Sequence, residues 1–370
     1  MSADLSAARI LAALGAALAL TACKPLAGKP APDLPVPPDP IVVSPTGTTT
    51  TPPTTTTSLL PPTSVSSAPT SATGTVAPPT TRTQETQPVP PGALAPGQIP
   101  APGQVGFRGD RAKLKVVNGP ASAPPGTEWN SGALRFGGGN VTLDGVWVKG
   151  GVEYSGSGTL TIRNSVIEGN RHSWSPLMAI SGHVDVRDST ITYADSEIPG
   201  SQWGNGVVHG DARMTLIRND ISGAPDGIQN GRGNSLIEQN HIHGMRVFGS
   251  PPNNTHNDGI QAYGGPNLRI RHNRIDISVG GKAYDGAHQN AAVFIMPSDD
   301  NPASNLEVVG NYLSGGGYIL RLGTPLSGAV VTGNRFGPTT GGWGEVLLDG
   351  GGIASWSGNV DASGNPVPRP

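Results

Sequence analysis

A short pattern recurs from about Asn140 onward at intervals of 21 to 38 residues. Each copy places a polar residue before Asn or Asp, then one further residue, then an aliphatic or aromatic one. The copies are Arg163-Asn164-Ser165-Val166-Ile167, Arg187-Asp188-Ser189-Thr190-Ile191, Arg218-Asn219-Asp220-Ile221, Gln239-Asn240-His241-Ile242, His272-Asn273-Arg274-Ile275, Gly310-Asn311-Tyr312-Leu313, Gly333-Asn334-Arg335-Phe336 and the degenerate Gly358-Asn359-Val360. A chain with this period folds as a stack of similar units that bury their apolar faces on one another.

Short β-branched segments surround each copy. Alternating strands are expected before it, as at 159–162, 214–217, 268–271 and 307–309, and second strands after it, as at 227–229, 259–261 and 292–295. No segment has helical periodicity over three turns, and the 54 glycines oppose helix formation. The repeat therefore predicts an all-β coil of short strands, tight turns and variable loops.

The repeated Asn has a physical reason. Asparagine tolerates the left-handed backbone of a sharp turn, and its amide can bond the backbone of the next coil. We therefore expect stacked asparagines along the axis and, two or three residues later, inward-facing aliphatic side chains.

The whole pattern resembles the right-handed parallel β-helix of the pectate-lyase-like superfamily. This resemblance implies a solenoid of about eight coils over residues 140–362. The alternative is a β-propeller, whose repeats are longer, about 40 residues with four strands each.

The part before residue 105 cannot form much of a core, because every aromatic residue lies at or after Phe107. We expect a disordered Pro/Thr/Ser-rich linker over 23–104, which is either a glycosylated stalk or a plain spacer. An N-terminal cap and first coil are expected at 105–139, and a disordered tail at 363–370. The formal net charge of −2 argues against a nucleic-acid partner.

Residues 1–22 have the layout of an export signal, with a short apolar run at 10–20. Leu20-Thr21-Ala22-Cys23 resembles the lipobox of bacterial lipoproteins, which implies lipidation of Cys23 and attachment to the bacterial cell membrane or wall surface. The alternative is an ordinary secretory signal with an incidental cysteine. A monomer is expected.

Long insertions between strands mark the place for a site, because adjacent long loops form the walls of a groove. They are 169–176, 194–205, 245–257, 279–290 and 297–304, and most fall between the same two strand positions. We expect them to rise on one side of the solenoid.

Two Asp-Gly-Ile-Gln segments lie beside these insertions. If they occupy neighbouring coils, Asp226 and Asp258 are about one strand spacing apart, roughly 4.8 Å. Two carboxylates this close either share a raised pKa, suited to general acid catalysis, or hold a cation such as Ca²⁺. Each aspartate lies two residues before an inward-facing isoleucine, so in a regular strand it would face inward too. Only a bend at the strand start exposes the aspartates. The alternative is that Asp-Gly is ordinary turn chemistry.

Further polar and aromatic residues belong to this hypothesis. His256 is the expected partner of Asp258, and Gln229 and Gln261 face outward, where they can orient a sugar. The candidate substrate-binding residues that complete the set are Tyr263, His288 and Trp203. For each aromatic, the alternative is that it only pins its own loop. His241 and His243 share one face of a strand, but no third metal ligand is evident from the sequence.

The segment 257–261 is similar to the Asn-Thr-Asp-Gly-Phe-Asp motif of polygalacturonase-type glycosidases, which implies a catalytic role for Asp258. The later acid of that motif is replaced by Gln261, and the family's Gly-His-Gly and Arg-Ile-Lys motifs do not follow. The first hypothesis is a surface-tethered lyase or glycoside hydrolase acting on a polysaccharide or cell-wall glycan. The alternative is a non-catalytic glycan-binding or adhesion protein.

Overall fold

The computed structural model describes residues 94–249, 254–278 and 289–370. The export signal with Cys23, most of the linker, and His288 lie outside the described residues. Within these ranges, no helix is long and apolar enough to cross a membrane.

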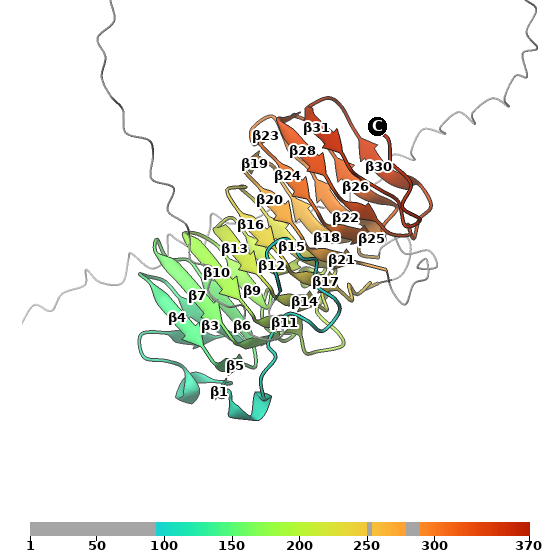
Figure 1. The fold of residues 1–370 in the computed structure, drawn as a ribbon. Coiled ribbons are helices and arrows are strands. Elements are labelled where there is room, and N and C mark those ends of the chain that lie inside the picture. Colours follow the sequence, from blue (N-terminus) through green and yellow to red (C-terminus); the bar gives the residue numbers. More distant parts are fainter. Residues whose placement is uncertain (1–93, 250–253, 279–288) are drawn as a thin grey trace, which may run out of the picture. The chain divides into compact units, whose positions relative to one another are not determined.

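The described chain winds through three parallel sheets, each of which takes one strand per turn of the coil (Figure 1). Sheet C contains β4 (Val141–Asp144), β7 (Thr159–Arg163), β10 (His183–Arg187), β13 (Arg213–Ile217), β16 (Leu236–Glu238), β20 (Arg269–Arg271), β24 (Glu307–Val309), β28 (Ala329–Thr332) and β31 (Ile353–Ser357). Sheet A contains β1 (Lys115–Val117), β5 (Val146–Val148), β8 (Val166–Gly169), β11 (Thr190–Tyr193), β14 (Asp220–Ser222), β17 (His241–His243), β21 (Arg274–Asp276), β25 (Tyr312–Ser314) and β29 (Arg335–Phe336).

Sheet B completes each turn. It contains β2 (Glu128–Asn130), β3 (Ala133–Phe136), β6 (Gly151–Tyr154), β9 (Leu177–Ala179), β12 (Gly206–Gly210), β15 (Asp226–Asn230), β18 (Asn257–Ala262), β22 (Gln289–Ile295), β26 (Tyr318–Leu322) and β30 (Gly344–Leu348). A small sheet D at the corner between sheets B and C contains β19 (Gly265–Pro266), β23 (Ala303–Ser304) and β27 (Leu326–Ser327). Three short 3₁₀ turns are η1 (Arg111–Lys113), η2 (Pro120–Ser122) and η3 (Gly200–Gln202).

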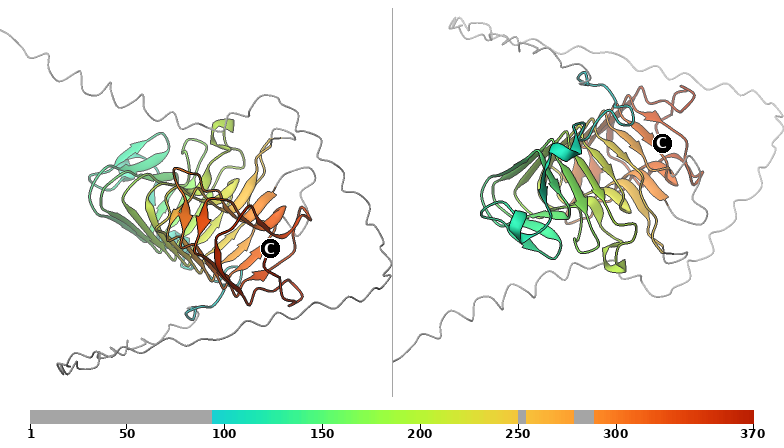
Figure 2. Two further views of the ribbon diagram at one scale, coloured as in Figure 1. Left: turned by 90° about the horizontal axis from the view of Figure 1, so that it is seen from above. Right: turned by 90° about the horizontal axis from the view of Figure 1, so that it is seen from below.

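From β4 to β30 the described chain makes eight coils in the order C, A, B, which confirms the predicted solenoid. The coils follow one another along the stack in chain order, as the two views of Figure 2 show. Equivalent residues pair in register, for example Ile221 with Ile242 and Ile242 with Ile275. These inward isoleucines are fully buried and form part of one continuous core, because a coil alone cannot cover its apolar side.

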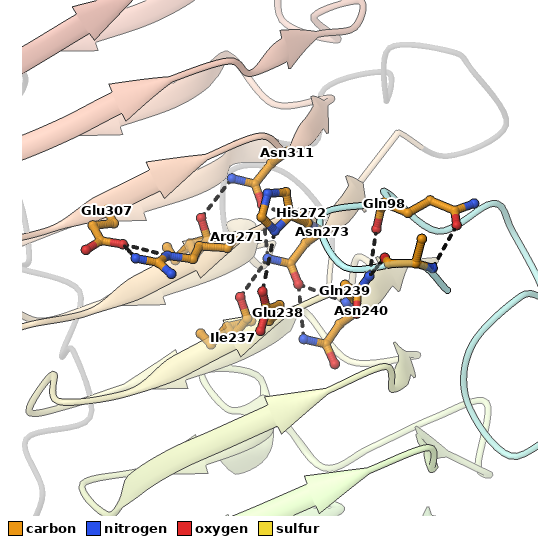
Figure 3. A network of polar contacts seen from close by, with 12 residues as sticks. Gln98, Ile237, Glu238, Gln239, Asn240, Arg271, His272, Asn273, Glu307 and Asn311 are labelled. Atoms are coloured by element: carbon orange, nitrogen blue, oxygen red, sulfur yellow. Dashed lines mark hydrogen bonds and ion pairs between the residues drawn. The ribbon is translucent and has the colours of Figure 1, made fainter. Parts of the chain in front are cut away.

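A buried amide ladder lies at the turn from sheet C to sheet A (Figure 3). The Asn273 side chain donates to the Ile237 carbonyl at 2.8 Å, and its oxygen accepts the Asn240 backbone N–H at 2.9 Å. The same arrangement links the six asparagines Asn219, Asn240, Asn273, Asn311, Asn334 and Asn359. The expected stack of asparagines is therefore present.

Two details of that expectation are wrong. The residue before each ladder asparagine adopts the left-handed backbone, as at Gln239 with φ 54° and His272 with φ 52°. In the two early copies Asn164 and Asp188 take this left-handed position, and Ser165 and Ser189 continue the ladder with their hydroxyls. The turn thus needs a left-handed residue and a separate buried polar one.

The folded part begins earlier than the predicted boundary at residue 105. The segment 94–106, here called the arm, lies along the outside of the ladder turn. Gln239 donates to the Ala95 and Gln98 carbonyls, and Arg274 donates to the Pro100 carbonyl. A Pro-rich segment loses N–H donors but keeps its carbonyl acceptors, so it can still be held this way.

The ends of the stack are covered by further segments. Before β4, the chain adds β1 to sheet A and a hairpin of β2 and β3 to sheet B, but no strand to sheet C. The tail 363–370, expected to be disordered, packs on the last coil. Val367 donates its N–H to the Asn359 carbonyl and accepts the Trp356 ring N–H, and Arg369 donates to the Ile353 carbonyl. These bonds satisfy backbone groups that the open edge would leave exposed.

Candidate functional site

Four of the five long insertions fall between a strand of sheet A and a strand of sheet B. They lie on two pairs of neighbouring coils, and the coil between these pairs has only residues 223–225 at this position. They precede β9, β12, β18 and β22, so all four join the same two sheets, as predicted. The fifth, at 297–304, lies at another corner, between sheets B and C, where it supplies β23.

The outer face of sheet B beside these loops carries a row of paired side chains, here called the outer row. Its members in stacking order are Arg135, Glu153, Met178, His209, Gln229, Gln261, Phe294 and Arg321. The adjoining inward row is apolar and fully buried, as at Val208, Ile228 and Ile260. Strand alternation therefore directs the outer row away from the core.

The middle of the outer row is a chain of amide hydrogen bonds. The Gln229 amide donates to the Gly204 carbonyl at 2.8 Å and to the Gln261 oxygen at 3.1 Å. The Tyr263 hydroxyl donates to the same Gln261 oxygen at 2.9 Å. Tyr263 and Met296 are each 39% exposed, so an apolar surface lies directly beside the amides.

A hollow of about 460 Å³ lies at the N-terminal end of the outer row. Its lining includes Arg135, Glu153 and the exposed Ile180. Arg135 Nε lies 2.7 Å from Glu153 Oε2, so the two charges offset each other. The outer face of sheet B thus combines a hollow, amides and exposed apolar side chains.

Asp226 and Asp258 occupy neighbouring coils at the starts of β15 and β18, as predicted. Asp258 donates its backbone N–H to Asp226 Oδ1 at 2.8 Å. Asp258 in turn accepts the Ala291 N–H at 2.8 Å and the Asn290 amide at 3.3 Å. The pair therefore forms a short carboxylate ladder between coils.

The strand bends at the glycine that follows each of these acids. A Cβ on Gly227 or Gly259 would meet the core residues Ile242 or Ile275 at 2.4 Å, so both glycine positions face inward together with the adjacent isoleucines. This bend places the Asp226 carboxylate on the side of Gln229, which donates to it at 2.6 Å. The pair is nevertheless covered, with Asp226 4% and Asp258 1% exposed.

Burial governs the electrostatics of the pair. Burial raises the pKa of Asp226 to about 7, and bonds from Asp258 and Gln229 only partly oppose it. Burial and the nearby Asp226 charge raise the pKa of Asp258 well above its ordinary value. Both carboxyls therefore ionise less readily than an exposed aspartate does, as expected for two buried acids this close.

His209 is the histidine that joins the outer row, because it pairs with Gln229. Burial lowers its pKa, against the charge of Asp211 and a hydrogen bond to Gln229. Its Nδ1 is buried without a hydrogen-bond partner. A neutral imidazole at this position can accept or donate a single proton.

Two further expected site residues, His256 and Trp203, differ from the acid pair in their surroundings. His256 is exposed, although it precedes the buried Asp258 by two residues. Trp203 donates from its ring to the Ile198 carbonyl at 3.1 Å and stacks on Phe248 with centroids 6.4 Å apart. Trp203 therefore pins its loop to the next one, and the catalytic and sugar-binding roles remain predictions.

A second polar cluster lies on the outer face of sheet A and was only half identified from the sequence. His241 and His243 project from β17, and the register places Asp220 of β14 beside His241. A ligand atom from each residue lies within 4.8 Å of the others.

The comparisons with known proteins add a family-level finding. A family model described as a right handed beta helix region matches residues 131–365. No curated protein and no solved structure matches the chain.

Proposed function

Because the chain belongs to the right-handed β-helix family over residues 131–365, which fits the pectate-lyase-like superfamily, we propose that it binds a polysaccharide along the outer face of sheet B. The observation that supports this is the half-buried Gln261 amide beside exposed Tyr263 and Met296. The prediction that Gln229 also contacts the sugar is wrong, because Gln229 is 2% exposed and only holds Gln261 in place. Amides bond sugar hydroxyls, and an aromatic face receives the apolar C–H side of a pyranose ring.

Binding without cleavage is the function that the geometry favours. The acids that a lyase or hydrolase would use are buried and hydrogen-bonded to the backbone of the next coil. Neutral contacts at Gln261, Tyr263 and Met296 suit a sugar chain that lies across the coils of β18 and β22. The bacterial surface tether described below would hold such a binder at its glycan.

Cleavage is the second candidate, and one observation favours it. The pKa of Asp226, raised to about 7 by burial, is the value expected of a general acid at neutral pH. Gln229 bonds both Asp226 and the Gln261 amide on the exposed side, so the acid lies one residue away from the proposed binding face.

Tyr263→Ala is expected to weaken binding to the recognised glycan about three- to tenfold, because one aromatic contact of this kind contributes roughly 0.5 to 1.5 kcal/mol. The measurement is affinity electrophoresis of the full chain on a panel of plant and bacterial polysaccharides. Tyr312→Ala on sheet A is the matched control and should bind as the wild type does.

The same panel separates the two candidates. New reducing or unsaturated ends released by the wild type but not by Asp226→Asn would establish cleavage. Binding of a glycan with no new ends supports the binding protein. The sheet B assignment is wrong if no glycan of the panel slows the wild type in the gel and none is cleaved by it. It is also wrong if Tyr263→Ala binds as well as the wild type does.

We further propose that Cys23 carries a lipid that holds the chain at the bacterial cell surface. Acyl chains stabilise membrane attachment by about 0.8 kcal/mol per buried CH₂. Expression in a bacterial host with an alkyne-labelled fatty acid should label the wild type and not Cys23→Ser. Equal labelling of both chains would contradict the anchor.

A further inference from the structure

We propose that Asp220, His241 and His243 bind a divalent transition-metal ion, with Zn²⁺ as the expected occupant. The cluster lies on sheet A, away from the outer row of sheet B. Its three side chains come from the neighbouring strands β14 and β17.

Strand alternation presents these side chains on one face. Ile221 and Ile242 are fully buried and lie opposite each other across the two strands. The flanking positions Asp220, His241 and His243 therefore face outward. Gly106 of the arm packs against Asp220, since a Cβ at Gly106 would lie 2.5 Å from the Asp220 Cβ.

The separations between the donor atoms fit one ion. Asp220 Oδ1 lies 3.2 Å from His243 Nε2, and Asp220 Oδ2 lies 3.5 Å from His241 Nδ1. Zinc bonds of about 2.0–2.2 Å at tetrahedral angles separate neighbouring ligand atoms by about 3.3 Å. The two rings are nearly parallel, with centroids 3.9 Å apart, so one ring must turn about its side-chain bonds before both in-plane lone pairs meet at one ion.

Hydrogen bonding alone leaves the cluster incomplete. The His241 side chain is 8% exposed, and its Nδ1 is buried without a hydrogen-bond partner although it is directed at the carboxylate. An unpaired buried ring nitrogen is costly. One metal ion would accept a lone pair from each ring and from the carboxylate, and would so satisfy all three groups.

The donor set selects the kind of metal. Two imidazole nitrogens and one carboxylate suit Zn²⁺ and its neighbours in the first transition row, whereas Ca²⁺ and Mg²⁺ take oxygen ligands. This site therefore differs from a Ca²⁺ between Asp226 and Asp258.

There is room for an external ligand. A hollow of about 400 Å³ adjoins the two histidines, and Met245, Arg246 and Asp276 also line it. Three protein ligands with an open position are the arrangement that lets a metal bind water or a small anion.

Isothermal titration of metal-free full chain with Zn²⁺ alone tests the proposal. The wild type is expected to bind about one ion, and His243→Ala and the isosteric Asp220→Asn should weaken this binding at least about tenfold. His183→Ala removes a histidine of sheet C and should bind as the wild type does.

Titration with Co²⁺ provides a second measurement. The wild type should develop the visible absorption of a cobalt ion with nitrogen ligands, and Asp220→Asn should not. Circular dichroism of each variant shows whether it has folded, and any unfolded variant is replaced by His243→Gln. Absence of Zn²⁺ binding by the wild type, or wild-type binding by the folded ligand variants, overturns the site.

Discussion

Asn273→Ala is expected to lower the free energy of unfolding by roughly 2 to 5 kcal/mol. The substitution removes the partner of the Ile237 carbonyl and of the Asn240 N–H, and both groups remain fully enclosed in the stack (Figure 3). Each unsatisfied buried group costs about 1–3 kcal/mol. The measurement is urea unfolding of the full chain, followed by tryptophan fluorescence.

An exposed amide ladder at another corner provides the control. Asn267 donates to Asn234 and accepts from Asn305, with its backbone at φ 56°. Asn267→Gly suits that left-handed backbone, and water replaces the lost bonds. We therefore expect a change within about 1 kcal/mol. Equal losses in the two variants would show that burial of the ladder contributes nothing.

The period of the sequence is what made the fold predictable. Copies of one pattern can bury their aliphatic residues only by stacking, so the eight coils, the strands around each copy and the placement of four loops between the same two sheets could all be inferred. The alignment of the first copies with the later ones could not be inferred. In Asn164-Ser165 the ladder residue follows the asparagine, whereas in Arg218-Asn219 the asparagine is itself the ladder residue. A serine hydroxyl and an asparagine amide serve there alike.

The prediction that Asp226 and Asp258 lie on neighbouring coils was correct, but their surroundings were only partly predicted. Alternation alone cannot show that the strand bends at Gly227 and Gly259, since Asp-Gly also reads as a turn. Nor can it show which loop covers Asp226, because the Gly204 carbonyl that binds Gln229 comes from an irregular insertion.

The cluster on sheet A was within reach of the sequence. Asn219 and Asn240 are equivalent ladder positions, so the residues after them, Asp220 and His241, had to be neighbours. A search for the third ligand along the strand of His241 and His243 misses Asp220, whereas a search one repeat earlier finds it. In a solenoid the informative neighbour of a side chain lies one period away.

Asp226→Asn is expected to gain roughly 2 to 3 kcal/mol of stability relative to the wild type between pH 5 and pH 8. In the fold the pKa of Asp226 is raised from 3.8 to about 7, mainly by burial. The wild type therefore has the full stabilisation from this group only below about pH 4, and loses it as the pH rises to about 7. Asparagine does not ionise, and its oxygen can still accept the Asp258 N–H.

Other groups with shifted pKa values do not confuse this comparison. Burial lowers the pKa of His209, which makes the fold less stable as the pH falls, but both proteins share that effect. Despite the opposing effect of burial, interactions with the nearby His241 and His243 hold the pKa of Asp220 at about 2, so its contribution is lost only in stronger acid. The difference between variant and wild type therefore isolates Asp226 and its coupling to Asp258.

The measurement is urea unfolding at half-unit steps from pH 5 to pH 8. Asp300→Asn, on the exposed Asp300, removes a carboxylate outside the acid pair and should keep the wild-type pH dependence. A stability difference between Asp226→Asn and the wild type that does not change with pH would mean that Asp226 is already ionised in the fold at pH 5. The carboxylate ladder would then be an ordinary charged cap of the strands, and the case for a general acid at this position would be lost with it.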